Sequence, residues 1–373
     1  MPPLRVLQVV PAMDMGGLEM FIMNVYRHID RQKVQFDFLY HYSHPCVFDD
    51  EIEALGGHIF RSSVREDNKV FNYLLDLEQF FKAHPYPVLH GHFSGFGAFY
   101  NHAAKKHGVA VRIGHSHNTQ TEKSLTGLAD AVLSSFLKYS ATHRFSCGEK
   151  AGRALFGNRS FEIYPNGIEV DRFLYDPQRD VDTRARLGLA DAVVYGHIGR
   201  FTQQKNHEFL LDIFAEIAKR QPEARLLLAG DGPLLPAAEQ HAAQLSIEDK
   251  VLFAGIQKDT PGLYSAMNAF VLPSLFEGFP VVLVEAQASG MPIFASDAVS
   301  PEAALTESVQ FLPLSAGAEG WAKAILENGD KRRDNRKTLF DAGYNTADTA
   351  QRLQEFYLSH AAPSPKHPSS WPG

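Results

Sequence analysis

The strongest constraint on the fold of this chain is a regular alternation of short apolar runs with segments long enough to form helices. In the first half, seven runs have the length and apolar content of β-strands, and the segment 69–84 carries apolar residues at helical spacing. Strands separated by helices are typical of βαβ units, which build a mostly parallel, doubly wound sheet. The predicted strands of this half are residues 6–10, 36–40, 58–61, 88–92, 111–115, 143–147 and 162–164.

The same alternation restarts after a break near the middle of the chain. The rhythm ends around Pro165-Asn166-Gly167, and residues 168–182 are polar, lack periodicity and contain Pro177. We therefore predict an interdomain linker over this segment. The predicted strands beyond it are residues 193–198, 225–229, 251–253, 269–272, 292–296 and 309–312, and the predicted helices are 206–220, 318–329, 332–342 and 345–359.

This repeated pattern predicts an α/β protein with two Rossmann-like, doubly wound parallel-sheet domains that face a cleft. A length of 373 residues leaves room for a full core in each domain. The predicted domains are residues 1–168 and 169–344, with 345–360 returning to the first domain. Residues 361–373 are rich in proline and serine, and we expect them to form a disordered tail.

Composition excludes several classes of protein. Residues 1–168 hold 17 Lys and Arg against 16 Asp and Glu, and the remainder holds 19 Lys and Arg against 27 Asp and Glu. Neither half is strongly basic, so the charge gives no indication of nucleic-acid binding. The distant Cys46 and Cys147 predict free thiols in a reducing compartment. We see no signal peptide and no apolar run near the roughly 20 residues that span a bilayer. These features predict a cytoplasmic protein, with contact at a membrane surface left open.

Two carboxylates stand out in the stretch 269–297. A predicted strand leads into a loop with Glu277, and a helix that opens at Pro280 and stops before Gly290 carries Glu285. In open α/β sheets, polar ligands bind at this carboxyl end of the strands. The two residues could also be the acid and base of a glycosidase, or simple helix-end charges, because the sequence does not determine their separation.

Two loops in equivalent positions of the two halves could hold an anion. Gly16 and Gly17 follow the first strand and precede a helix, so their backbone can approach a negatively charged ligand. A helix-capping turn is the alternative, and a dehydrogenase is set aside because G-x-G-x-x-G is missing there. Arg200 and Lys205 follow the first strand of the second half and can reach a phosphate, unless they are ordinary surface cations.

Four histidines lie at the ends of two predicted strands. The members of each pair, His90 with His92 and His115 with His117, are two residues apart and therefore share one face of their strand. A zinc site is conceivable, but no cysteine or H-E-x-x-H pattern supports it. We favour a polar surface that hydrogen-bonds a hydroxylated substrate.

Several of these motifs together resemble one family. The run Ser274-Leu-Phe-Glu277-Gly-Phe-Pro280-Val-Val-Leu-Val-Glu285-Ala is similar to the E-x7-E motif of the retaining GT-B glycosyltransferases of family four. The resemblance covers nearly the whole chain, and within the family it is strongest to enzymes of bacterial capsular and exopolysaccharide assembly. The other matching motifs are Gly16-Gly-Leu-Glu19, Arg112-Ile-Gly-His115-Ser-His117-Asn118, Pro165-Asn-Gly-Ile168, Gly199-Arg200 with Gln204-Lys205-Asn206-His207, and Gly230-Asp-Gly-Pro233.

The resemblance implies a role for each matching residue. Glu285 would hold the ribose hydroxyls of a nucleotide sugar and Glu277 the hydroxyls of the transferred sugar. Arg200, Lys205 and the Gly16-Gly17 backbone would neutralise the diphosphate leaving group, without a metal or other cofactor. One departure is Gln204-Lys205-Asn206 in place of Glu-Lys-Gly. The implied catalytic residues are His117, Glu277, Arg200 and Lys205; donor binding adds Gly16, Gly17, Gly278, Phe279 and Glu285; the second-choice or acceptor residues are His115, His92 and Asn118.

The resulting prediction is a retaining glycosyltransferase of bacterial surface polysaccharide synthesis. It would move a sugar from a nucleotide diphosphate sugar, with UDP favoured, to a saccharide or lipid-linked saccharide held mainly by the first domain. That domain could contact the inner face of the membrane, and no nucleic acid is expected as a partner. The alternatives are a nucleotide-sugar epimerase or phosphorylase on the same fold, and a non-catalytic protein that binds sugar nucleotides.

Overall fold

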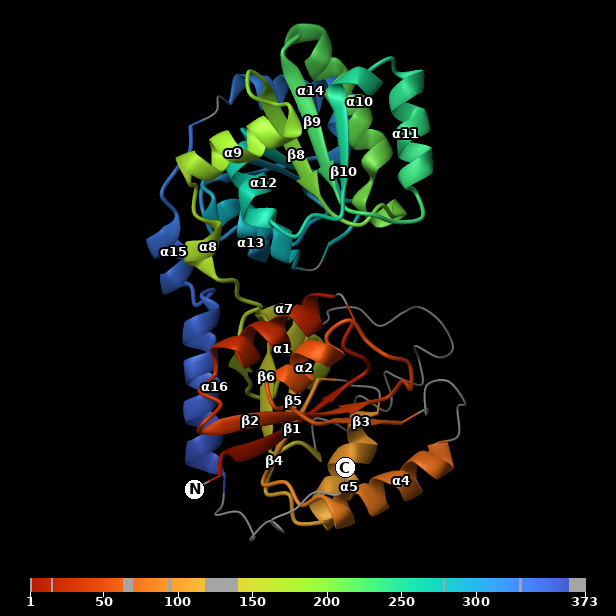
Figure 1. The fold of residues 1–373 in the computed structure, drawn as a ribbon, viewed down its shortest axis with the longest axis vertical. Coiled ribbons are helices and arrows are strands. Elements are labelled where there is room, and N and C mark those ends of the chain that lie inside the picture. Colours follow the sequence, from red (N-terminus) through yellow and green to blue (C-terminus); the bar gives the residue numbers. More distant parts are fainter. Residues whose placement is uncertain are drawn as a thin grey trace. The chain divides into compact units, whose positions relative to one another are not determined.

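The structure is a computed structural model that describes residues 2–14, 16–62, 70–92, 96–117, 140–277, 279–328 and 331–361 (Figure 1). The chain divides into two compact units. The first contains Met1–Asn166 and the segment from Thr346 onward, and the second contains Gly167–Asn345. Each unit has its own parallel sheet. The predicted tail lies outside the described residues from position 362 onward.

The first unit is built on a seven-stranded parallel sheet in the order β3-β2-β1-β4-β5-β6-β7. Every residue of the inner strands β2 and β4 is buried, as expected for a sheet covered by helices on both faces. The strands are β1 (Leu4–Val10), β2 (Val34–Tyr40), β3 (Ile59–Arg61), β4 (Val88–Gly91), β5 (Val111–Ser116), β6 (His143–Ser146) and β7 (Glu162–Ile163). The helices are α1 (Gly17–His28), α2 (Asp49–Ala54), α4 (Val70–Ala83), α5 (Gly97–Lys106), α7 (Glu149–Phe156) and α16 (Thr346–His360).

The last helix, α16, belongs to the first unit although it follows the second in sequence (Figure 1). It packs on α1 and β2. Leu353 and Tyr357, each 1% exposed, enter the core of the first sheet. Gln354 accepts a hydrogen bond from the backbone N–H of Asp30 at 2.8 Å. This docking also carries the hydroxyl of Tyr357 into the interior of the first unit.

The second unit has a six-stranded parallel sheet in the order β10-β9-β8-β11-β12-β13, so the expected α/β architecture of two doubly wound parallel sheets is confirmed. Strand order reverses at β8, which lies between β9 and β11; in such sheets, ligands bind at this switch point. The strands are β8 (Val193–Ile198), β9 (Ala224–Ala229), β10 (Val251–Gly255), β11 (Ala269–Leu272), β12 (Ile293–Ser296) and β13 (Val309–Leu312). The helices are α8 (Val170–Phe173), α9 (Pro177–Leu187), α10 (His207–Arg220), α11 (Leu235–Gln244), α12 (Thr260–Ala266), α13 (Val281–Ala288), α14 (Gly317–Glu327) and α15 (Arg336–Asp341).

The irregular linker predicted over residues 168–182 is wrong, because this segment forms α8 and most of α9. Asp176 caps α9 by accepting hydrogen bonds from the backbone N–H groups of Gln178 and Arg179, and Gly188 ends the helix at φ +69°. Pro177 is the first residue of the helix, where its missing N–H has no cost. The helix is polar on nearly all sides, so the apolar stripe on which the prediction depended is missing.

The helix expected after Glu277 is confirmed as α13, although it begins at Val281 and Pro280 serves as its N-cap. Leu283 and Val284 are 0% exposed, so burial against the sheet outweighs the weak helix propensity of valine. Gly290 follows the helix at φ +78°, and a Cβ at this position would collide with the carbonyl oxygen of Arg333. Only glycine fits this turn without displacement of the backbone.

Among the helices that the structure describes, none combines the length and the apolar content needed to cross a lipid bilayer.

Candidate functional site

An ion pair joins the loops that follow β8 and β11. Lys205, at the end of a short 3-10 turn, donates from Nζ to Oε1 of Glu277 at 2.5 Å. Ser274 Oγ donates to the same carboxylate oxygen at 3.2 Å. The side chains of Lys205 and Glu277 are only 16% and 8% exposed, so water screens the pair weakly. The structure thus places two of the predicted catalytic residues in direct contact.

The two loops are held together by the residues that flank Lys205. Gln204 donates from Nε2 to the carbonyl of Phe276 at 3.0 Å, and its own carbonyl accepts from the N–H of Leu275 at 2.8 Å. Asn206 donates from Nδ2 to the carbonyl of Pro273 at 3.1 Å. Asn206 also has φ +57°, a conformation that asparagine tolerates better than most residues. The Gln-Lys-Asn departure from the family pattern therefore has a structural role in this chain.

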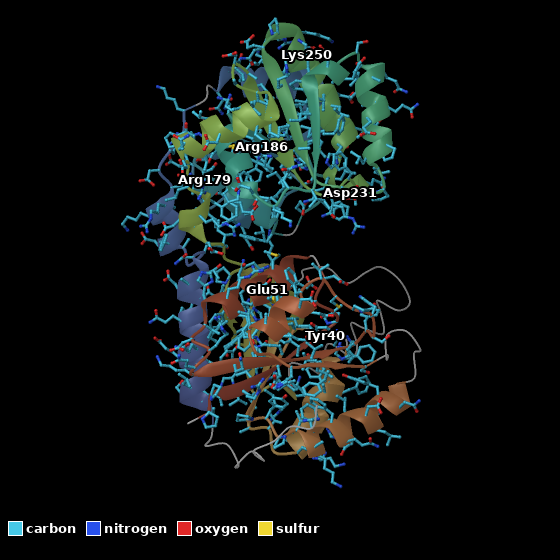
Figure 2. All side chains as sticks on the ribbon, viewed as in Figure 1. Tyr40, Glu51, Arg179, Arg186, Asp231 and Lys250 are labelled. Carbon is cyan, nitrogen blue, oxygen red and sulfur yellow. The ribbon has the colours of Figure 1, made fainter. Side chains whose placement is uncertain are left out.

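Arg200 lies on the same loop as Lys205 but differs from it in exposure and in contacts. It is exposed, and its guanidinium forms no hydrogen bond or ion pair with any of the residues that the structure describes. A hydrogen bond joins this loop to the turn that follows β9: the backbone N–H of Phe201 donates to the carbonyl of Asp231 at 2.9 Å. Figure 2 shows Asp231 at one end of the second sheet and Lys250, which precedes β10, at the other. Arg200 is thus a cation available to a ligand at the carboxyl ends of the strands.

Glu285 lies on α13, and its carboxylate pairs with a tyrosine. Tyr264 on α12 donates from Oη to Oε2 of Glu285 at 2.7 Å. Burial raises the pKa of Glu285 to about 7, although the hydrogen bond from Tyr264 and the positive charge of Arg172 act in the opposite direction. The carboxyl group therefore changes its charge within the physiological pH range. Tyr264 was missed in the sequence because nothing in the pattern links it to a residue 21 positions later.

We expect the variant Glu285→Gln to be more stable than the wild type at pH 8 and to lose most of that advantage at pH 5. The carboxyl group ionises near pH 7 in the folded chain but at a lower pH when unfolded, so its burial costs stability only as pH rises through this window. The difference is at most about 3 kcal/mol, because the side chain keeps partial contact with water. Thermal unfolding of both proteins at the two pH values measures it; a constant difference would contradict the raised pKa.

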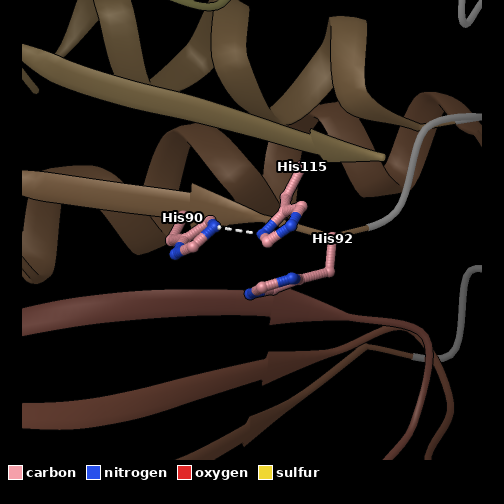
Figure 3. Close-up of side chains that lie close together, drawn as sticks. All are labelled: His90, His92 and His115. Atoms are coloured by element: carbon pink, nitrogen blue, oxygen red, sulfur yellow. Dashed lines mark hydrogen bonds between the residues drawn. The ribbon is translucent and has the colours of Figure 1, made fainter. Parts of the chain in front are cut away.

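In the first unit, the four predicted histidines form one cluster at the ends of β4 and β5, in which His90, His92 and His115 are buried and His117 is partly buried. His90 Nε2 and His115 Nδ1 lie 3.0 Å apart, and His92 Nδ1 and His117 Nε2 lie 2.9 Å apart. Figure 3 shows the first of these contacts, with the ring of His92 stacked beside that of His90. The ring of Phe21, from α1, packs against His92, His115 and His117.

The electrostatic state of this cluster follows from its burial. Burial lowers the pKa values of His90, His92 and His115 well below the usual value, and their mutual repulsion adds to the effect. Burial also lowers the pKa of His117 to about 3, with an opposing contribution from the side chain of Asn166. All four imidazoles are therefore neutral at pH 7, and each carries one proton and one lone pair.

Two groups of side chains have the spacing of metal ligands. Ring nitrogens of His90, His92 and His115 lie within 4.8 Å of one another, as do ligand atoms of a second, partly exposed group, Asp14, His44 and Cys46. In the histidine group, the nitrogens are already hydrogen-bonded except Nε2 of His115. A metal ion would break those bonds, and no carboxylate among the described neighbours offsets its charge. This geometry favours a hydrogen-bonded cluster over a metal centre.

The Gly-Gly loop differs from a simple anion site. Gly16 is the N-cap of α1 in extended conformation, and no side chain caps the helix. The carboxylate of Glu19 folds back toward Gly16, where an added Cβ would collide with it. Burial raises the pKa of Glu19. An anion bound at Gly16 and Gly17 would therefore require Glu19 to move or to take up a proton.

The remaining predicted residues lie elsewhere or outside the described residues. Phe279 stacks on Tyr344 with ring centroids 5.3 Å apart, which is a packing contact within the second unit. Asn118 and Gly278 fall outside the residues that the structure describes.

Nothing in the sequence singles out Gln8, whose side chain contacts His92 in the first unit. It lies within the apolar strand β1, where the pattern predicts only a core position.

Known structures identify the fold that this chain adopts. HepE of Anabaena, solved in complex with UDP, matches with a TM-score of 0.77 at 19% identity, over 96% of this chain and 100% of that one. A glycosyltransferase of Rickettsia africae matches with a TM-score of 0.76 at 14% identity, over 96% of this chain and 98% of its own. The fold is that of the GT-B glycosyltransferases.

Sequence relatives identify the family. The model of the family described as glycosyl transferases group 1 matches residues 192–328. EpsF of Bacillus subtilis, whose name places it among the glycosyltransferases, is 36% identical over 368 residues, 95% of this chain and 96% of that protein. An α-1,3-galactosyltransferase of Escherichia coli, named for UDP-Gal and α-D-GlcNAc-diphosphoundecaprenol, is 25% identical over 60% of this chain and 61% of its own. The chain belongs to the group 1 glycosyltransferases and is a transferase enzyme.

Proposed function

We propose that this glycosyltransferase moves a sugar from a UDP-linked donor to a hydroxyl group of a saccharide or lipid-linked saccharide, with retention of the anomeric configuration. The Lys205–Glu277 pair beside Arg200 carries the proposal. It supplies two cations and a carboxylate at the carboxyl ends of neighbouring parallel strands, where an open α/β sheet binds its ligand. Retention and the UDP preference rest on the resemblance of the E-x7-E motif.

The proposed reaction places negative charge on the departing diphosphate. The bond between C1 of the donor sugar and the phosphate oxygen breaks, and the oxygen leaves with the electron pair. The acceptor hydroxyl oxygen bonds to C1, and its proton passes to the departing phosphate. Arg200 and Lys205 stabilise the developing charge, as preorganised cations do in a site shielded from water. The proposal includes no metal and no cofactor, because these two side chains supply the positive charge.

The carboxylates of the second unit would hold the donor. Glu285 accepts hydrogen bonds from the ribose hydroxyls, and Tyr264 holds one of its oxygens in place. Glu277 accepts from hydroxyls of the transferred sugar, next to the backbone of Gly278 and Phe279. When the donor binds, its diphosphate takes over part of the contact that Lys205 makes with Glu277. The backbone at Gly16 and Gly17 assists after Glu19 gives way.

The first unit would hold the acceptor, with His117 facing a sugar hydroxyl and His115, His92 and Asn118 as second choices. The name of the Escherichia coli relative includes a lipid-linked saccharide acceptor, which supports an acceptor of that kind here. The proposed role in surface polysaccharide synthesis rests on the resemblance of the motifs to those of enzymes of capsular and exopolysaccharide assembly. Such an acceptor would be reached from the cytoplasmic side, by peripheral contact of the first unit with the membrane.

Two alternatives use the same fold. An epimerase or phosphorylase would act on a sugar nucleotide or a phosphorylated sugar without a saccharide acceptor, and a non-catalytic protein would bind the nucleotide only. The intact ion pair, together with the guanidinium of Arg200, which has no partner among the residues that the structure describes, favours catalysis over simple binding. The products of an incubation with UDP-sugars alone distinguish an epimerase.

A panel of nucleotides tests the proposal. UDP and at least one UDP-sugar are expected to raise the melting temperature of the protein more than GDP, ADP and their sugars do, because a ligand of the folded state stabilises it by mass action. The stabilising UDP-sugar should then be consumed in the presence of a saccharide or polyprenyl-diphosphate saccharide acceptor, at the same rate with and without EDTA. A preference for GDP or ADP would overturn the UDP assignment, and a rate abolished by EDTA would overturn metal independence.

A further inference from the structure

A chain of hydrogen bonds in the first unit ends at His117, the histidine that the proposed function places against a sugar hydroxyl. Gln8, in the middle of β1, is 1% exposed. Its Oε1 lies 2.8 Å from Nε2 of His92, and Nδ1 of His92 lies 2.9 Å from Nε2 of His117. The chain thus connects a central strand with the end of β5.

The direction of these hydrogen bonds follows from charge and valence. The amide oxygen of Gln8 can only accept, so His92 must carry its proton on Nε2 and leave Nδ1 as a lone pair. Nδ1 of His92 then accepts from His117, whose proton must lie on Nε2. Because burial keeps both rings neutral, neither has a second proton to donate. Nδ1 of His117 is consequently a bare acceptor.

The orientation of the Gln8 amide decides this direction. Its oxygen Oε1 lies 2.8 Å from Nε2 of His92, whereas its nitrogen Nε2 is buried without a hydrogen-bond partner among the described residues. Reversing the amide would place its N–H groups against His92 and move the proton of His117 to Nδ1. The position of the proton on His117 therefore reports the orientation of the Gln8 amide.

We propose that Gln8 and His92 are positioning residues that keep His117 protonated on Nε2, so that Nδ1 is presented as a hydrogen-bond acceptor for a sugar hydroxyl. Nδ1 of His117 is buried and has no hydrogen-bond partner among the described residues. A bound hydroxyl would satisfy that acceptor, and a deoxy sugar would leave it unpaired. The role of the hydroxyl rests on the proposed function, whereas the position of the proton does not.

The proton position can be measured without any substrate. In the full-length protein labelled with ¹⁵N-histidine, long-range ¹H–¹⁵N spectra at pH 7.5 should show an unprotonated Nδ1 for His117, assigned by comparison with His117→Asn. In Gln8→Met the acceptor is gone, so the His117 nitrogen shifts should move toward values averaged over both tautomers. The second variant, His92→Phe, keeps an aromatic ring in place but removes the hydrogen bond to His117. The His117 nitrogen shifts should therefore move in the same direction as in Gln8→Met.

Gln35→Met is the matched control, because Gln35 is buried on the neighbouring strand β2 and bonds to Tyr26 rather than to a histidine. It should leave the His117 signals unchanged. If transfer is observed, Gln8→Met should lower kcat about tenfold or more, as loss of a partner that orients a histidine does, with little change in the donor KM. A wild-type His117 protonated on Nδ1, or unchanged His117 signals in folded Gln8→Met, would overturn the proposal. The predicted tautomer in a protein that transfers no sugar would refute only the proposed function.

Discussion

Replacing Lys205 with methionine is expected to lower the rate of sugar transfer by at least about 100-fold, the loss that follows removal of one group that stabilises developing charge. The side chain lies at the switch point of the second sheet and contacts Glu277 at 2.5 Å. Methionine keeps most of the apolar stem but cannot neutralise a departing diphosphate. The measurement is kcat with a saturating UDP-sugar and acceptor.

The same substitution also removes the partner of a carboxylate that is only 8% exposed. Breaking a buried ion pair from one side costs about 3–5 kcal/mol, so Lys205→Met should unfold at a lower temperature. The double variant with Glu277→Gln removes the unpaired charge, and we expect it to regain stability but not activity. Such a result separates catalysis from folding.

Lys219→Met is the control for a general effect of losing a lysine. Lys219 pairs with Glu216 at the surface of α10 and is 67% exposed. Exposed pairs contribute little, so both stability and transfer should stay close to the wild-type values. A Lys205→Met protein that transfers sugar at a near-normal rate would disprove the assigned role of Lys205.

Replacing Glu285 with alanine is expected to weaken UDP binding by roughly 10- to 150-fold, because a hydrogen bond to a charged group contributes about 1.5–3 kcal/mol. Calorimetric titration with UDP measures the change. The affinity of the wild type should also improve as pH rises from 6 to 8. The pKa of Glu285 is about 7, and the ionised form is the better acceptor for ribose hydroxyls.

UDP itself titrates near neutral pH, so the pH dependence needs its own control. Glu285→Gln keeps the shape of the side chain and an acceptor for Tyr264 but cannot ionise. The affinity of the wild type for UDP should change more with pH than that of this variant, and the difference between the two is the contribution of Glu285. Equal affinity for UDP in the wild type and in Glu285→Ala would show that Glu285 does not hold the nucleotide.

Much of the fold was predictable because it depends on local pattern. The strands at 193–198, 269–272 and 309–312 agree with β8, β11 and β13 residue for residue, since strands of a parallel sheet are short, largely apolar runs between turn residues. Helix α9 was missed because its signals, Asp176 before Pro177 and Gly188 after the last turn, are caps rather than an apolar stripe. Periodicity detects helices that bury one face and misses those that do not.

The candidate site was predictable only in part. By itself, the sequence determined the two sheets and the placement of Arg200, Lys205, Glu277 and the histidines at the ends of strands, because residue period and turn chemistry act over a few positions. Only the tertiary structure decided which side chains meet. Lys205 contacts Glu277 because β8 lies beside β11, Glu285 pairs with Tyr264 across two helices, and His92 bonds to Gln8 across β1 and β4. Strand order and helix packing bring together residues far apart in sequence, and they depend on the whole core rather than on any one segment.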